Sequence, residues 1–324
     1  MTGADAARRP TVLYIAGAGR SGSTLLERML GAVPGLVNVG ELVDLFRRVK
    51  DGDELCGCGR AFSACPFWTA VGERAFGGWT PALAAEFVEL KARVGRQRDL
   101  PQLLAPTRAR AFQDGLERYG ELHRRVYDAV LAESGAHVVV DASKGVAHAL
   151  AFTRSGQVDV RLLHLVRDAR GVAFSWAKAG VARPQAGAPG ATMSSFSPEL
   201  TAARWTLLQG EITMARRLFT ASTRVRYEDL VRSPARVVGD ALTALGLPPG
   251  PGALAHIDGN RVDLPVTHGL SGNPSRFRSG VQELRADEQW RRDMSRRDRI
   301  VTTAIAAAPL TGYGYVGPRE RRPS

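Results

Sequence analysis

The chain has 324 residues, of which 44% are hydrophobic, so it can bury a core sufficient for one large domain or two small ones. Its 44 Lys and Arg residues against 32 Asp and Glu residues give a net charge of +12, which suits a polyanionic ligand. The sequence contains no run of about 18 apolar residues, so we predict no membrane-spanning helix and a cytoplasmic protein.

The basic residues do not form the pattern of a nucleic-acid-binding protein. Arginines are scattered along the chain and often lie beside acidic residues, as in Arg291-Arg292-Asp293. The sequence contains no zinc-finger, RNP or helix-turn-helix signature. We therefore predict that the polyanionic ligand is not a nucleic acid.

Residues 17–24, Gly-Ala-Gly-Arg-Ser-Gly-Ser-Thr, form the most informative segment of the chain. They follow a strand-like apolar run at 11–16 and precede a helical pattern at 25–30. A glycine-rich turn between a strand and a helix directs backbone amides and the positive end of the helix dipole to one point. The segment therefore predicts a phosphate-binding loop.

Two known phosphate-binding loops fit this segment in part. The nucleotide-triphosphatase loop G-x-x-x-x-G-K-[ST] matches Gly17, Gly22 and Thr24, but Ser23 replaces the lysine that contacts the β- and γ-phosphates. The dinucleotide fingerprint G-x-G-x-x-G also fits, but it requires an acidic residue after a second strand, and 33–37 is a poor strand. The loop therefore predicts a ligand phosphate that is not part of a triphosphate.

The three cysteines lie close together as Cys56, Cys58 and Cys65. Three thiolates can bind zinc with a fourth ligand, but no histidine is close in sequence and the spacing fits no standard zinc module. A disulfide between Cys65 and either other cysteine needs an oxidising compartment. A plain thiol-containing turn and a chain without metal are the leading interpretation, with zinc and a disulfide left open.

The rest of the chain alternates helical and strand-like segments, which predicts an α/β fold with a central parallel sheet flanked by helices. We expect one domain over 11–316, between a disordered tail at 1–10 and a second tail at 317–324. The predicted segments are a helical insertion at 79–133 broken between Pro101 and Pro106, strands at 137–141, 160–166 and 223–227, helices at 145–155, 168–178, 198–220, 234–245 and 287–307, a loop at 180–197, and an irregular stretch from Gly250.

Several segments together resemble the sulfotransferases that use 3′-phosphoadenosine 5′-phosphosulfate. Residues 20–24 are similar to the loop that binds the 5′-phosphosulfate in that family. Arg167, at the end of a predicted strand, is followed eight residues later by Ser175, as in the family's 3′-phosphate motif. The segments 226–230 and 272–278 also resemble the family.

The resemblance extends from residue 11 to about residue 290 and implies a three-layer P-loop-like fold. It also implies that the donor is a co-substrate bound without a metal, because cations and amides already hold its phosphates. The residues that it assigns to the donor are Gly19, Arg20, Ser21, Gly22, Ser23 and Thr24 for the 5′-phosphosulfate, and Arg167 and Ser175, joined by Arg276 or Arg278, for the 3′-phosphate.

The resemblance further implies two catalytic residues. Glu41 matches the glutamate thought to act as the base in tyrosylprotein-like and many bacterial sulfotransferases, whereas aryl and steroid relatives use a histidine. Lys144 matches the lysine near the bridging oxygen of the donor. His268, which precedes the segment 272–278, is the reserve candidate for the base.

We therefore predict an enzyme that transfers a sulfonate group to a hydroxyl of a small-molecule, carbohydrate or glycolipid acceptor. A P-loop kinase-like phosphotransferase and a non-catalytic nucleotide-binding module are the alternatives. A large distance between the phosphate loop and Glu41 or Lys144 would favour the binding module. Variable loops, here 45–130 and 180–197, shape the acceptor site in this family, so the sequence leaves the acceptor and the oligomeric state open.

Overall fold

The computed structural model describes residues 9–47, 53–178, 192 and 194–317 of the chain. The tails predicted at 1–10 and 317–324 and the loop predicted at 180–197 lie largely outside these residues. None of the described helices is both long enough and apolar enough to cross a membrane.

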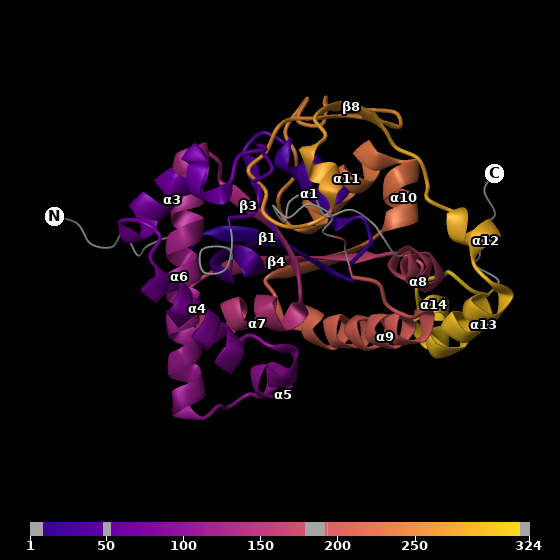
Figure 1. Cartoon of the computed structure of the whole chain (residues 1–324), viewed down its shortest axis with the longest axis horizontal. Helices are drawn as coiled ribbons and strands as arrows, with labels where there is room; N and C mark the ends of the chain where they lie inside the picture. The colour runs from indigo at the N-terminus through magenta and orange to yellow at the C-terminus, as the bar shows by residue number, and fades with distance from the viewer. Residues whose placement is uncertain (1–8, 48–52, 179–191, 193, 318–324) are drawn as a thin grey trace.

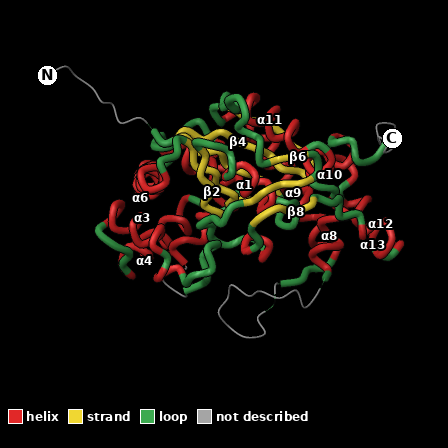
Figure 2. Tube along the Cα trace, turned by 90° about the horizontal axis from the view of Figure 1, so that it is seen from above, coloured by secondary structure: helices red, strands yellow, loops and turns green. Residues whose placement is uncertain are grey.

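A parallel sheet runs through the middle of the molecule, with helices around it (Figure 2). Within the described residues its strands lie in the order β2-β3-β1-β4-β5, and every neighbouring pair is parallel. This arrangement confirms the predicted α/β fold. The strands are β1 Thr11–Gly17, β2 Leu36–Gly40, β3 Val138–Lys144, β4 Asp159–Val166 and β5 Ala221–Arg226.

The central strand β1 contributes to hydrophobic cores on both faces of the sheet. Val12 and Tyr14 pack into one core and Leu13 and Ile15 into the other, because successive side chains of a strand point to opposite faces. Figure 1 shows α1, α10 and α11 above the sheet and α7 and α9 below it. These helices are α1 Ser23–Gly31, α7 Val146–Ser155, α9 Pro198–Ala215, α10 Tyr227–Arg232 and α11 Pro234–Ala244.

The predicted helical insertion is present and packs against α7 and the sheet at one end of the molecule, coloured purple in Figure 1. Its helices include α6, which is long because 25 residues pass without a proline. The insertion and the segment before it form α3 Pro66–Phe76, α4 Pro81–Val94, α5 Leu100–Leu104 and α6 Arg110–Ser134. Asp168 caps the predicted next helix, α8 Ala169–Ala177, by accepting a hydrogen bond from the Arg170 amide.

The expectation of a poor strand at 33–37 is wrong for its last two residues, because 33–35 are outside any strand but β2 begins at Leu36 and continues to Gly40. Its residues pair with β3 on one side, and Leu270 pairs with Gly40 on the other. A side chain at Gly40, whose φ is 75°, would collide with the Leu270 carbonyl oxygen. Tertiary pairing therefore makes a strand of a segment that local pattern disfavours.

The stretch from Gly250 is also less irregular than predicted. It contains a small antiparallel sheet of β6 Ile257–Asp258, β7 Arg261–Leu264 and β8 Gly280–Glu283. The turn Gly259-Asn260 is a hairpin signal that could have predicted the pairing of β6 with β7, but not the pairing of β7 with β8. The final predicted helix is divided into α12 Gln289–Asp293, α13 Arg296–Ile305 and α14 Ala307–Gly312, with Ser295 capping α13.

Candidate active site

A cavity of about 530 Å³ opens where the strands of the central sheet end, and we call it the edge pocket. Its volume is within the range of about 300–1,000 Å³ typical of small-molecule sites. Ligands of open parallel sheets bind at this edge. The end of every strand supplies a lining residue: Gly19 after β1, Glu41 after β2, Lys144 at the end of β3, Arg167 after β4 and Tyr227 after β5.

The turn between β1 and α1 presents to the edge pocket a helix end that is suited to an anion. Helix α1 begins after Gly22, whose φ is 90° and which gives no side-chain cap to the first turn. The amides of that turn have no partner within the helix and lie at the positive end of its dipole. A side chain at Gly22 would lie 2.6 Å from the ring of Tyr227, so only glycine fits. The predicted loop residues that line the pocket are Gly19, Arg20, Gly22, Ser23 and Thr24.

The second predicted phosphate motif reaches the same pocket from β4 and α8. Arg167 and Ser175 both line the pocket. Arg20 of the glycine-rich loop lines it too, although 147 residues separate Arg20 from Arg167 in the sequence. The Arg167 guanidinium donates to the Arg20 carbonyl oxygen at 2.9 Å and to the Asp287 carboxylate at 3.0 Å. It also lies over the ring of Tyr227, 4.6 Å from its centroid. These contacts hold a cation at a fixed place in the pocket.

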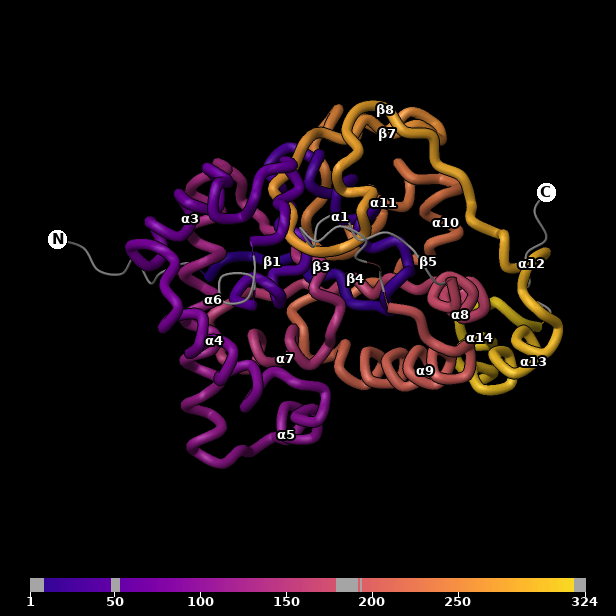
Figure 3. Tube along the Cα trace, viewed as in Figure 1, coloured from indigo at the N-terminus to yellow at the C-terminus, as the bar shows by residue number. Residues whose placement is uncertain are grey.

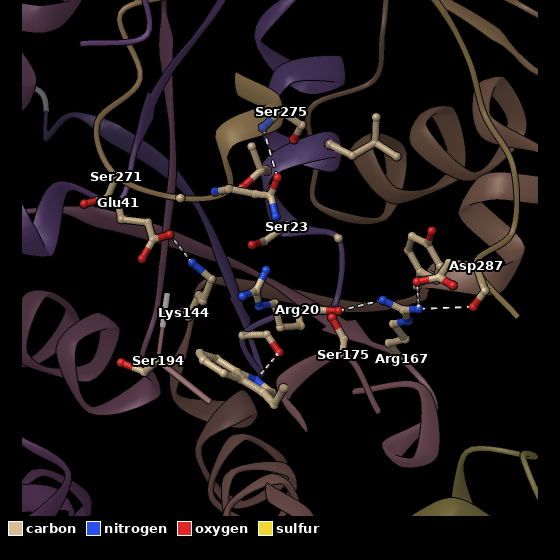
Figure 4. A pocket seen from close by; sticks show the side chains of 18 of the residues that line it. Arg20, Ser23, Glu41, Lys144, Arg167, Ser175, Ser194, Ser271, Ser275 and Asp287 are labelled. Carbon is tan, nitrogen blue, oxygen red and sulfur yellow. Dashed lines mark hydrogen bonds and ion pairs between the residues drawn. The ribbon is translucent and has the colours of Figure 1, made fainter. Parts of the chain in front are cut away.

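Glu41 and Lys144 form an ion pair at the other end of the pocket from Arg167, with Arg20 and Ser23 between (Figure 4). Both side chains are mostly buried, with exposed fractions of 18% and 19%. The Glu41 amide donates to the Leu270 carbonyl oxygen at 2.8 Å, which fixes the backbone at this point. The structure therefore brings a carboxylate and an ammonium group beside the predicted phosphate loop.

Backbone strain is concentrated at the edge pocket. Arg20, Lys144 and Ser271 have φ values of 68°, 69° and 57°, and they are the non-glycine residues with left-handed backbone among those described. All three line the pocket. Such a conformation costs about 1–3 kcal/mol per residue and is common where a site needs a fixed geometry. The strain therefore supports a functional role for this cavity.

Four candidate donor or catalytic residues from the sequence, Ser21, Arg276, Arg278 and His268, do not line the edge pocket. The Ser21 side chain is buried, and its hydroxyl has no hydrogen-bond partner within the described residues. The buried Arg276 guanidinium donates to the carbonyl oxygens of Leu55, at 2.6 Å, and Ser271. His268 lies with Nδ1 3.2 Å from the sulfur of Cys65. In this structure Arg276 therefore joins two backbone segments, and His268 faces the cysteines.

Two acidic residues near the pocket have no motif that could have identified them. Burial acts to raise the pKa of Asp287, but hydrogen bonds and charge from Arg167 outweigh it, so the pKa is lowered. Burial raises the pKa of Glu27 to about 8, although the charge of Lys144 opposes this rise. For Glu27 the sequence offered one indication, which is that a glutamate falls among the residues of α1 that are buried.

The parallel sheet and the glycine-rich loop at its edge define a P-loop-like α/β enzyme. The sequence profile of the sulfotransferase family matches residues 12–250, which include both phosphate motifs, Glu41 and Lys144. The chain therefore belongs to the sulfotransferase family and is a sulfotransferase enzyme. No curated protein sequence gives a significant match.

Two solved structures are similar to this chain. The sulfotransferase domain of the Synechococcus PCC 7002 olefin synthase matches with a TM-score of 0.52 and 19% identity, over 96% of this chain and 97% of that domain. A sulfotransferase of Mycobacterium avium matches with a TM-score of 0.45 and 13% identity, over 95% of this chain and 78% of that protein. The first of these likenesses supports the P-loop-like fold.

Proposed function

We propose that this sulfotransferase transfers a sulfonate group from 3′-phosphoadenosine 5′-phosphosulfate to a hydroxyl of a small-molecule, carbohydrate or glycolipid acceptor. One observation carries the proposal: the two phosphate motifs, around Arg20 and Arg167, line one cavity with the Glu41–Lys144 pair. A donor with phosphates at both the 3′ and the 5′ position of its ribose needs two separate anion sites. Figure 4 shows Arg20 and Arg167 at different places along the pocket.

The residues present fit this donor. The uncapped first turn of α1, with Arg20, Ser23 and Thr24, provides amides, a guanidinium and hydroxyls for the 5′-phosphosulfate. Arg167 and Ser175 provide a charge and a hydroxyl for the 3′-phosphate. Asp287 and Tyr227 orient the Arg167 guanidinium, so less of its conformational freedom remains to be lost on binding.

The chemistry that we propose uses the ion pair. The phosphosulfate anion competes with Glu41 for the Lys144 ammonium, which leaves the Glu41 carboxylate available to an acceptor hydroxyl. Glu41 takes the hydroxyl proton as the acceptor oxygen forms a bond to sulfur, and the bond from sulfur to the bridging oxygen breaks. Lys144 neutralises the negative charge that develops on the leaving phosphate, and fixed charges of this kind usually give the largest catalytic contribution.

The two alternatives from the sequence gain no support. Glu41 and Lys144 line the same pocket as the phosphate loop, so the separation that would favour a non-catalytic binding module is not seen. Ser23 occupies the position of the triphosphate-binding lysine, which disfavours a kinase.

Binding of the reaction product tests the donor. We expect 3′-phosphoadenosine 5′-phosphate to bind at least tenfold or so more tightly than ATP, because the second anion site adds charge-assisted hydrogen bonds worth about 1.5–3 kcal/mol each. Calorimetry with each nucleotide, with and without magnesium, measures this difference. Tighter, magnesium-dependent binding of ATP would contradict the proposed donor.

The Arg167 site can be tested by substitution. We expect Arg167→Ala to weaken binding of 3′-phosphoadenosine 5′-phosphate by about ten- to a hundredfold, because one or more charge-assisted hydrogen bonds are lost. The loss should largely disappear for adenosine 5′-phosphate, which has no 3′-phosphate. Arg236→Ala, at an exposed position of α11, is the matched control. An equal loss for both nucleotides would place Arg167 away from the 3′-phosphate.

A further inference from the structure

The three cysteines and His268 converge on one point outside the edge pocket. Cys56 and Cys58 lie in a tight turn, Cys65 precedes the first residue of α3, and His268 comes from the stretch between β7 and β8. One possible ligand atom from each of the four residues lies within 4.8 Å of all the others. The cluster joins a segment from the N-terminal part of the chain to one from its C-terminal third, and these parts of the chain are purple and orange in Figure 3.

The distances fit a tetrahedral metal site. With Zn–S bonds of about 2.3 Å and Zn–N bonds of about 2.0–2.1 Å, the edges of a tetrahedron are about 3.8 Å between sulfurs and about 3.6 Å between sulfur and nitrogen. The Sγ atom of Cys65 lies 3.6 Å from that of Cys56 and 3.8 Å from that of Cys58. The Nδ1 atom of His268 lies 3.7 Å from Sγ of Cys56 and 3.2 Å from Sγ of Cys65.

The surroundings hold the histidine in this orientation. The ring of Phe67 stacks on the imidazole, with centroids 4.7 Å apart and an angle of 12° between the planes. The indole N–H of Trp68 donates to the His268 carbonyl oxygen at 2.8 Å. An outer set of contacts that orients the ligands is a regular feature of metal sites.

The other two interpretations of the cysteines explain less. A disulfide requires sulfurs about 2.05 Å apart, uses only two of the three thiols and gives no role to His268. A plain thiol turn does not require a histidine more than 200 residues away to face two of the sulfurs.

We propose that Cys56, Cys58, Cys65 and His268 bind one zinc ion. Four protein ligands fill a tetrahedral shell, as in structural zinc sites, and leave no position for a substrate. The ion is therefore structural and takes no part in sulfonate transfer. This proposal departs from the sequence prediction of a chain without metal.

The site holds one wall of the edge pocket in place. Beside the ligands, the Gly57 amide donates to the Gly269 carbonyl oxygen at 3.0 Å. The next residue, Leu270, exchanges backbone hydrogen bonds with Val39 and Glu41, and Ser271 lines the pocket and donates to Asp44 at 2.9 Å. The zinc ion thus joins the turn at 56–60 to the segment that fixes the Glu41 backbone.

Elemental analysis of the full chain tests the site directly. Protein without an affinity tag, purified under reducing conditions and dialysed against metal-free buffer, should contain one zinc per chain. X-ray absorption should give about three sulfurs at about 2.3 Å and one nitrogen at about 2.0 Å. Wild-type protein with no stoichiometric metal and three freely titrating thiols, or with a disulfide, would overturn the proposal.

Substitutions assign the ligands. Cys65→Ser and His268→Ala should reduce the zinc content well below one per chain, whereas His137→Ala, at an exposed position outside the cluster, should retain it. If the cysteine variant does not fold, cobalt exchanged into wild-type protein provides the second readout. Intense sulfur-to-cobalt charge-transfer absorption supports the thiolate ligands, and its absence overturns them.

The link to the edge pocket is a separate measurement and rests on the proposed role of Glu41. Zinc-free protein should keep most of its affinity for 3′-phosphoadenosine 5′-phosphate, but lose turnover and melt at a lower temperature. Zinc-free protein with unchanged melting and turnover would refute the supporting role. Failure to bind the nucleotide even with zinc present would instead contradict the proposed donor.

Discussion

Replacing Glu41 by glutamine should lower turnover by about 10²–10⁴-fold, the usual effect of losing a general base. The amide keeps the size of the carboxylate but cannot accept the acceptor proton. Binding of 3′-phosphoadenosine 5′-phosphate should change little, because the predicted phosphate contacts come from the loop at 19–24 and from Arg167. Loss of sulfonate from a labelled donor, in the presence of a crude mixture of hydroxyl acceptors, measures turnover.

A matched control separates this effect from a general loss of carboxylate charge. Glu89→Gln changes a glutamate on α4 whose side chain is 72% exposed, and it should leave turnover unchanged. Full turnover in Glu41→Gln would show that the proton acceptor lies elsewhere. Asp44, which also lines the pocket, would then be the next residue to test.

Replacing Lys144 by methionine should lower turnover by about 10²–10³-fold, as when one group that stabilises transition-state charge is removed. Methionine keeps the unbranched stem, and both residues meet the same backbone strain at a φ of 69°. The affinity for 3′-phosphoadenosine 5′-phosphate should fall to a smaller extent, because Lys144 contributes most when charge develops on the leaving phosphate. Calorimetry and the labelled-donor assay together separate the two effects.

Lys178→Met is the control for Lys144→Met. Lys178 is exposed at the end of α8, and its ammonium donates to Gln289, outside the pocket lining. Its loss should change neither turnover nor binding. Lys144→Met with unchanged turnover and a large loss of affinity would show that Lys144 only binds the donor.

Features that depend on local sequence could be predicted without the structure. The glycine-rich loop contains φ values that favour glycine, as at Gly22. A requirement of this kind can be recognised from a few consecutive residues of the sequence. The buried strands β1, β3 and β4 each contain an apolar run, at 12–16, 138–140 and 162–166, the last interrupted by His164, and such runs are typical of a parallel sheet. Arg167 comes directly after the apolar run of β4, so its position at the edge of the sheet could be predicted from that strand.

Local pattern was insufficient where long-range pairing decides the conformation. Strand β2 contains a glycine and follows Pro34-Gly35, yet it forms because β3 and Leu270 offer it hydrogen-bonding partners. The small sheet β6-β7-β8 likewise depends on packing of Ile257 and Val262 against the core above the main sheet. Contacts of this kind are absent from any window of neighbouring residues.

The sequence by itself determined the loop, the strands β1, β3, β4 and β5 that lead to the edge pocket, and the residue types able to hold phosphate. Only the tertiary structure decided which distant side chains meet: Asp287 with Arg167, Glu41 with Lys144, and His268 with the cysteines. The reason is physical, because hydrogen-bonding and steric needs of the backbone act between neighbours, whereas ion pairs and metal ligands depend on distances that the complete fold sets.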